Sequence, residues 1–136
     1  MYRYKVEVTR VVDGDTVDVD IDLGFGMIYK KQRVRMKGID TPESRTRDLV
    51  EKKFGLASKK FLKEELKDKE IELVSHDKGK FGRILGELFV GDSTYSINKL
   101  MIDNYFAVLY DGQSKEDIEA NHLLNRERLT ESGLVV

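Results

Sequence analysis

The chain has 136 residues, enough for one domain with a single hydrophobic core. Its 24 Lys and Arg residues nearly balance 25 Asp and Glu, and the net charge of −1 argues against nucleic-acid binding by bulk charge while leaving room for a local cationic site. The absence of cysteine excludes disulfides and thiolate metal sites. No apolar run approaches membrane-spanning length and no signal peptide precedes the first expected strand, so we expect a cytoplasmic protein, or a trimmed secreted form, with no membrane partner.

The first part of the chain predicts two strands joined by a tight turn. Residues 4–12 are rich in β-branched and aromatic side chains, and an Asp-Gly-Asp turn follows at residues 13–15. In residues 17–22 apolar side chains alternate with acids, which gives a second strand with one apolar and one acidic face. Asp15 shares the parity of the apolar positions, so we expect its carboxylate to face inward.

A third strand, residues 31–37, alternates between basic and largely apolar side chains after a wider turn at residues 24–26. Its basic face consists of Lys31, Arg33, Arg35 and Lys37. The strand breaks at Gly38 and runs into the turn Asp40-Thr41-Pro42-Glu43. A basic strand face suits phosphate, and acids at a strand end suit a metal or a general base. Taken alone, however, this stretch favours a solvated face followed by an ordinary Asp/Pro turn.

Two inward-facing carboxylates are expected at strand ends, because Asp40 shares the parity of Val34 and Met36 just as Asp15 shares that of its own strand. Burying a carboxylate without a partner is costly. We therefore predict a cation between Asp15 and Asp40.

The rest of the chain predicts a small mixed domain. The expected elements are a helix from a capping pair at Asp48 and Glu51 to about Asp68, strands 70–75 and 84–90 around a polar loop 76–81, a short helix ending near Asn104, an extended segment 105–110, and a last helix from Ser114 to Gly133. Five strands with three helices, one lying between the third and fourth strands, indicate a mainly β (α+β) fold. We predict a five-stranded Greek-key OB-fold barrel with helices outside, occupying residues 1–136 as a single domain.

Three segments of this sequence resemble the signatures of a known family. They are DGDT at residues 13–16, VRMKGIDTPE at residues 34–43 and KFGR at residues 80–83. With these segments in this order, the chain closely resembles the staphylococcal nuclease (thermonuclease) family from Val11 to about Gly133. The DGDT segment alone is weak evidence, because Asp-Gly turns are common. The arginine and DTPE of the second segment, about twenty residues later, followed by FGR in the third, are strong evidence of the resemblance. The family is built on an OB-fold barrel, in agreement with the predicted strand count.

The resemblance implies a calcium-dependent phosphodiesterase that hydrolyses DNA or RNA with little sequence preference and leaves 3′-phosphate ends. Carried onto this chain, the calcium ligands are Asp15, Asp40 and the carbonyl of Thr41; the active-site glutamate is Glu43; and the phosphate-clamping arginines are Arg35 and Arg83. Calcium prefers carboxylate and carbonyl oxygens, and arginine offers a planar fork that matches phosphate, so the residue types suit these roles.

Further residues are expected to bind substrate. Lys80 supplies charge, while Phe81 stands where the founding nuclease has a tyrosine and therefore has no hydroxyl to donate. Tyr110 matches one of two later family tyrosines, with Tyr105 a weaker match. The other expected substrate-binding residues are the basic-face side chains Lys31, Arg33 and Lys37.

The sequence also leaves an alternative function open and gives expectations for the two histidines and the partners. The main alternative function is a non-catalytic OB-fold module that binds nucleic acid; no feature of the sequence supports a protein-interaction domain. His76 and His122 are expected to be structural or surface residues, because no ligand-type residues surround them in the sequence. The expected partner is a DNA or RNA substrate, and we expect a monomer without an obligate protein partner.

Overall fold

The computed structural model describes residues 2–78 and 82–136, which form seven strands and three helices. The elements are β1 (Arg3–Asp13), β2 (Thr16–Asp22), β3 (Ile28–Met36), β4 (Ile39–Asp40), α1 (Leu49–Leu66), β5 (Ile71–Lys78), β6 (Ile84–Val90), α2 (Ile97–Asp103), β7 (Val108–Leu109) and α3 (Lys115–Glu131). No helix among these residues is long and apolar enough to cross a bilayer.

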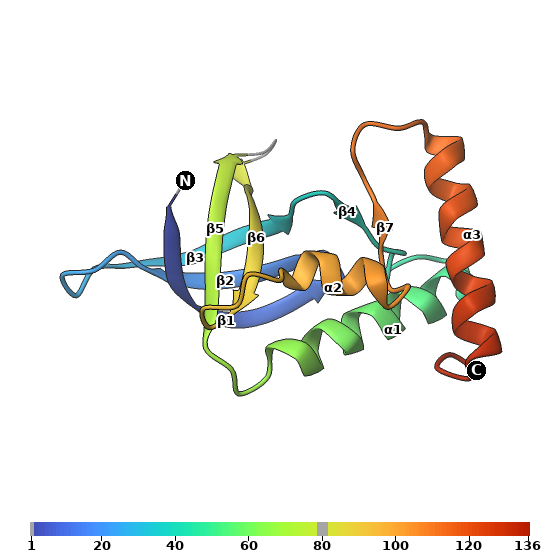
Figure 1. Ribbon diagram of the computed structural model, residues 1–136, viewed down its shortest axis with the longest axis horizontal. Helices are drawn as coiled ribbons and strands as arrows, with labels where there is room; N and C mark the ends of the chain where they lie inside the picture. The colour runs from blue at the N-terminus through green and yellow to red at the C-terminus, as the bar shows by residue number, and fades with distance from the viewer. Residues whose placement is uncertain (1, 79–81) are drawn as a thin grey trace.

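Five strands close into a barrel in the order β1-β2-β3-β6-β5. Neighbouring strands are antiparallel except for β3 and β6, which are parallel, and β5 closes the barrel against β1. The three helices lie outside the barrel (Figure 1). Closure removes the free sheet edges that would otherwise need protection. The predicted OB-type barrel with helices, mainly β in character, is confirmed.

The barrel core is made by the apolar faces that the sequence alternation predicts. Val17 of β2 lies opposite Val34 of β3, and both side chains are fully buried. Met36, Leu73 and Leu88 are buried with them. Because successive strand residues point to opposite faces, the intervening charged side chains lie outside.

Three boundaries differ from those expected. The strand β3 begins at Ile28, and the expected alternation is regular only from Gln32, because Lys30 and Lys31 together lie opposite Asp20. Lys31 has a φ of +58° and its amide donates to the Asp20 carboxylate at 2.9 Å, which fixes this bulge. The strand β5 extends through His76 into the expected loop. Of the expected extended segment 105–110, only β7 is a strand, and it pairs with β4.

Candidate active site

The buried carboxylate of Asp15 ties the β1–β2 turn to the end of β3. Only 8% of Asp15 is exposed; its backbone carbonyl accepts from the Met36 amide at 2.8 Å. Its carboxylate oxygens accept from the Thr16 hydroxyl at 2.9 Å and from the Thr41 amide at 3.2 Å. Burial raises the pKa of Asp15, and the nearby Arg35 charge and these hydrogen bonds oppose that rise. The inward orientation predicted for Asp15 is therefore confirmed.

Arg35 lies between the two acids. Its Nη1 is 3.3 Å from Asp15 Oδ2, and its Nη2 is 3.5 Å from Asp40 Oδ1. The Arg35 side chain is only 18% exposed, so these contacts are largely shielded from water. The divalent cation predicted between Asp15 and Asp40 stays a prediction, while the Arg35 guanidinium pairs with both carboxylates. The basic strand face contributes this charge, although its alternation alone predicts an outward-facing arginine.

A cavity of about 450 Å³ lies beside this arginine. The predicted site residues that line it are Arg35, Lys37, Asp40, Arg83 and Tyr110. The parallel pairing of β3 with β6, in which Arg35 lies opposite Leu85, brings the segment before β6 to this end of β3. The Tyr110 amide donates to the Gly38 carbonyl at 2.8 Å and so holds the β7 end at the same cavity. Tyr105, in contrast, contacts the Arg128 guanidinium with its ring.

Glu43 lines a second cavity, also of about 450 Å³, whose lining shares Asp40 and Tyr110 with the first. Its side chain is exposed, but its backbone amide donates to the Glu51 carboxylate at 3.1 Å. Asp48 caps α1 as predicted, by accepting from the amides of the first turn. The reciprocal half of the predicted capping pair is wrong, because Glu51 bonds the Glu43 amide instead.

Gly55 of α1 fixes how closely the helix approaches the Glu43 backbone. A Cβ on Gly55 would lie 2.2 Å from the Glu43 carbonyl oxygen and 2.7 Å from the Ser44 nitrogen. Only glycine permits this approach, which explains a residue that otherwise weakens a helix. The helix therefore supports the segment that carries Glu43.

His122 is a site residue that sequence reasoning does not find. Its Nε2 lies 2.8 Å from Asp40 Oδ2, and its side chain is 14% exposed. The contact joins residues 82 positions apart, so no local spacing indicates it. His76 likewise has defined partners, because its ring nitrogens lie 2.6 Å from the Glu87 carboxylate and 3.3 Å from the Lys37 ammonium. The expectation that both histidines are structural or surface residues does not include these contacts with Asp40 and Lys37.

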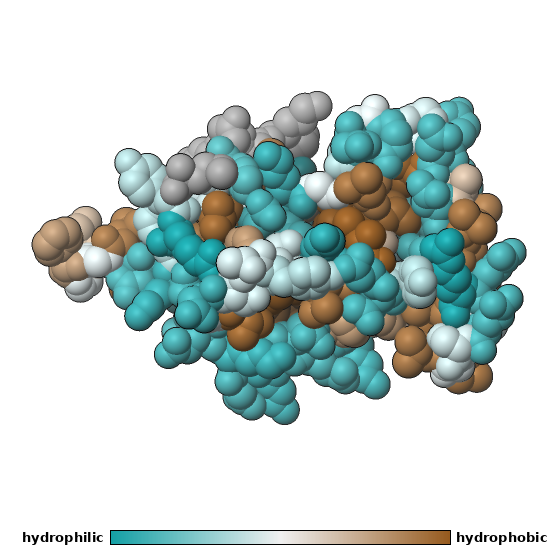
Figure 2. All heavy atoms as spheres, in the orientation of Figure 1, coloured by the Kyte–Doolittle hydropathy of each residue, from teal (hydrophilic) through white to brown (hydrophobic). Residues whose placement is uncertain are grey.

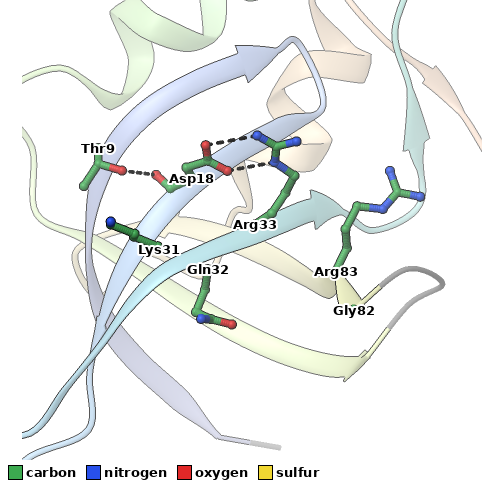
Figure 3. Close-up of a pocket in the computed structure, with 7 residues that line it drawn as sticks. All are labelled: Thr9, Asp18, Lys31, Gln32, Arg33, Gly82 and Arg83. Carbon is green, nitrogen blue, oxygen red and sulfur yellow. Dashed lines mark hydrogen bonds and ion pairs between the residues drawn. The ribbon is translucent and has the colours of Figure 1, made fainter.

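The remaining basic-face residues lie along a groove of about 750 Å³. Figure 3 shows its lining residues, with Arg33 turned toward Asp18 of β2 and Arg83, from the segment before β6, extending away from Lys31. Arg33 forms two hydrogen bonds with the Asp18 carboxylate, at 2.9 and 3.2 Å. Lys31 lines the same groove. The predicted substrate-binding residues Lys80 and Phe81 lie outside the described residues.

The carboxylate oxygens at this site are ligands of the type that a hard divalent cation prefers. Among the side chains that the structure describes, no three His, Asp or Glu residues group together as a metal site. Asp15 and Asp40 are the two carboxylates that contact Arg35, and they would be the protein's carboxylate ligands. Thr41 is buried directly behind Asp15, and its hydroxyl oxygen has no hydrogen-bond partner among these residues. Carboxylate and carbonyl oxygens are the ligands that calcium prefers, with water and substrate completing the shell.

The fold and the site define an OB-fold barrel with arginines and carboxylates gathered at one cavity. The family model described as "Staphylococcal nuclease homologue" matches residues 33–132, a segment that includes Arg35, Asp40, Glu43 and Arg83. The chain belongs to the staphylococcal nuclease family.

Three relatives illustrate the range of this similarity. A protein named thermonuclease from Staphylococcus intermedius is 33% identical over 92 residues, covering 66% of this chain and 51% of the relative. An uncharacterised protein of Methanocaldococcus jannaschii is 33% identical over 71% of this chain and 53% of its own length. A protein named uncharacterized endonuclease from Escherichia coli is 29% identical over 93% of this chain and 74% of its own length. The chain spans about half the length of the first curated relatives it matches.

Proposed function

We propose that this protein is a calcium-dependent nuclease that hydrolyses phosphodiester bonds in DNA or RNA with little sequence preference and leaves 3′-phosphate ends. The observation that carries the proposal is the position of Arg35, which contacts Asp15 and Asp40 and lines one cavity with Arg83. Arginines, which suit phosphate, therefore lie beside carboxylates, which suit a divalent cation, and this supports the proposal. The names of the staphylococcal and Escherichia coli relatives support the same activity.

Each residue has a role that suits its chemistry. Arg35 and Arg83 bind the phosphate, and their hydrogen bonds strengthen as negative charge spreads over the phosphate oxygens in the transition state. Glu43 takes the proton of the attacking water or holds that water in line. Asp15, Asp40 and the Thr41 carbonyl would hold calcium, which neutralises the phosphate charge and acidifies or orients the water.

Weak sequence preference follows from the kind of side chains that line the groove. Lys31, Arg33 and Arg83 are phosphate-binding residue types, and phosphate contacts position a nucleic acid without reading its bases. DNA and RNA both present such phosphates. The barrel therefore offers affinity for the backbone at the site where cleavage is proposed.

The test is cleavage of single-stranded DNA, duplex DNA and RNA, with calcium and with excess chelator. We expect cleavage with calcium only, and product ends that polymerase extends only after phosphatase treatment. Arg35→Ala should abolish cleavage, whereas the matched variant Arg33→Ala should mainly weaken binding, because Arg33 contacts Asp18 rather than the site acids. Full activity in chelator would exclude the calcium requirement. Binding without cleavage under any condition would instead support the non-catalytic module.

A further inference from the structure

The hairpin between β2 and β3 carries an exposed apolar tip far from the candidate site. Figure 1 shows this hairpin projecting from the barrel at the left, and Figure 2 shows apolar spheres at the same end of the molecule. The residues of this apolar tip are Leu23, Phe25, Met27, Ile28 and Tyr29, all of them exposed, with Phe25 fully so. A contiguous exposed apolar surface of this kind is characteristic of a binding site.

Hydrogen bonds within the turn give the tip a defined conformation. The Leu23 amide donates to the Met27 carbonyl at 2.8 Å, and the Met27 amide donates to the Gly24 carbonyl at 2.9 Å. The Asp22 carboxylate accepts from the Gly24 amide at 2.8 Å. Phe25 itself has a φ of +56°, which is unfavourable for any residue other than glycine. The turn thus adopts an unfavourable backbone conformation that leaves the Phe25 ring exposed to water. This arrangement is expected where the ring binds a partner.

The tip is continuous with the basic side of the barrel. Lys30 and Lys31 follow it directly and are exposed, and Lys31 lines the groove that ends at Arg83. Arg83 also lines the cavity beside Arg35. On the neighbouring strand, Asp18 pairs with Arg33, and Asp20 and Asp22 accept from the amides of Lys31 and Gly24. Lys31 and Arg83, together with the Arg33 that pairs with Asp18, line the groove that leads from the tip toward the candidate site.

We infer that the apolar tip binds unpaired bases of the nucleic acid whose phosphates follow β3 to the candidate site. This inference rests on the proposed function for the identity of the ligand. The rings of Phe25 and Tyr29 supply flat surfaces, and stacking on aromatic rings is how proteins bind bases without regard to sequence. From Ile28 to Arg35, β3 extends about 23 Å at about 3.3 Å per residue. Only a substrate several nucleotides long can therefore reach both the tip and the site.

The chain contains no tryptophan, so Phe25→Trp places a single fluorescent probe at the tip. In excess chelator, where cleavage is not expected, a single-stranded oligonucleotide of about 20 nucleotides should quench this tryptophan, because stacking bases quench indole emission. Vesicles of phosphatidylcholine and phosphatidylglycerol should leave the emission unchanged, and so should an increase in protein concentration. A blue shift with vesicles and no response to the oligonucleotide would overturn the inference in favour of a lipid surface. A change with protein concentration alone would overturn it in favour of a second copy of this chain.

Cleavage kinetics test the same inference at the substrate end. Phe25→Ala should raise KM for a 20-nucleotide single strand by about 5- to 160-fold, the effect of losing one stacked base, with kcat unchanged. The same variant should leave cleavage of a dinucleotide unaffected, because that substrate cannot reach the tip. Phe25→Leu should behave like Phe25→Ala, since it keeps apolar area without a ring. Leu134→Ala, an exposed apolar change near the C-terminus at the other end of the molecule, is the matched control (Figure 1).

These outcomes separate the two proposals. Recovery of wild-type KM by Phe25→Leu, or equal effects on the long and short substrates, would overturn the stacking inference while leaving the nuclease proposal intact. If no substrate is cleaved at all, the nuclease proposal fails, and quenching of the Phe25→Trp probe still decides whether the tip binds bases.

Discussion

Replacing Gly55 by alanine tests whether α1 positions Glu43. The new Cβ would lie 2.2 Å from the Glu43 carbonyl oxygen, whereas carbon and oxygen atoms normally approach to about 3.3 Å or more. The Glu43–Ser44 peptide must therefore move by about 1 Å. Misplacement of a catalytic group by about 1 Å costs about 10²-fold in rate. We expect Gly55→Ala to lose about that much in single-turnover cleavage.

The stability of the same variant follows from two opposing terms. Alanine favours a helix over glycine by about 1 kcal/mol, while overpacking a buried contact costs about 1–3 kcal/mol. The free energy of unfolding measured in urea should therefore fall by about 0–2 kcal/mol. Lys52→Ala, at an exposed position in the first turn of the same helix, is the control and should leave the rate unchanged. A Gly55→Ala variant with wild-type turnover and higher stability would refute the supporting role of this contact.

Three further predictions concern individual site residues. Glu43→Gln should slow single-turnover cleavage by about 10²–10⁴-fold with calcium affinity retained, and a rate within a few-fold of wild type would leave Glu43 only a role in the turn. Arg83→Lys should lose about 10³-fold or more at saturating enzyme, because lysine keeps the charge without the two-pronged geometry; near-wild-type cleavage would reduce Arg83 to a charge. His122→Ala should weaken calcium binding, measured by calorimetry, by about 10–100-fold through the freed Asp40 carboxylate, and unchanged affinity would remove His122 from the site.

The sequence predicts the barrel well because its evidence is local. Apolar residues at every second position, such as Val17 and Val19 in β2, place one strand face in the core whatever the rest of the chain does. The N-cap at Asp48 is likewise decided within one helical turn. Even the inward orientation of Asp15 follows from its parity with Val17.

The contacts within the site depend on packing between distant segments and are not local. The parity of Arg35 predicts an outward side chain, yet a long arginine at a strand end can bend toward Asp15 and Asp40, which are brought there by a turn and by the β4–β7 pair. The contact of His122 with Asp40 requires the position of α3, which no pattern in the helix itself specifies. The bulge at Lys31 requires the Asp20 side chain of the neighbouring strand.

Because Asp15 is buried, its ionisation should make the free energy of unfolding depend on pH. Burial raises its pKa above the ordinary value of 3.8, by more than Arg35 and the hydrogen bonds lower it. The folded state therefore holds this proton more tightly than the unfolded state, so the stability contributed by the group is fully present below pH 3.8 and is lost as pH rises through the raised pKa. Asp15→Asn has no proton to lose, while Arg35 keeps its contact with Asp40.

We therefore expect urea unfolding in chelator to show equal stability of Asp15→Asn and wild type in acid, and greater stability of the variant toward neutral pH. A variant that is less stable by the same amount at every pH would show that the pairing with Arg35 outweighs burial. The same substitution should abolish calcium binding, because it removes one of the two site carboxylates. A gain in stability accompanied by loss of metal would mean that the charge of Asp15 is kept for function at the expense of the fold.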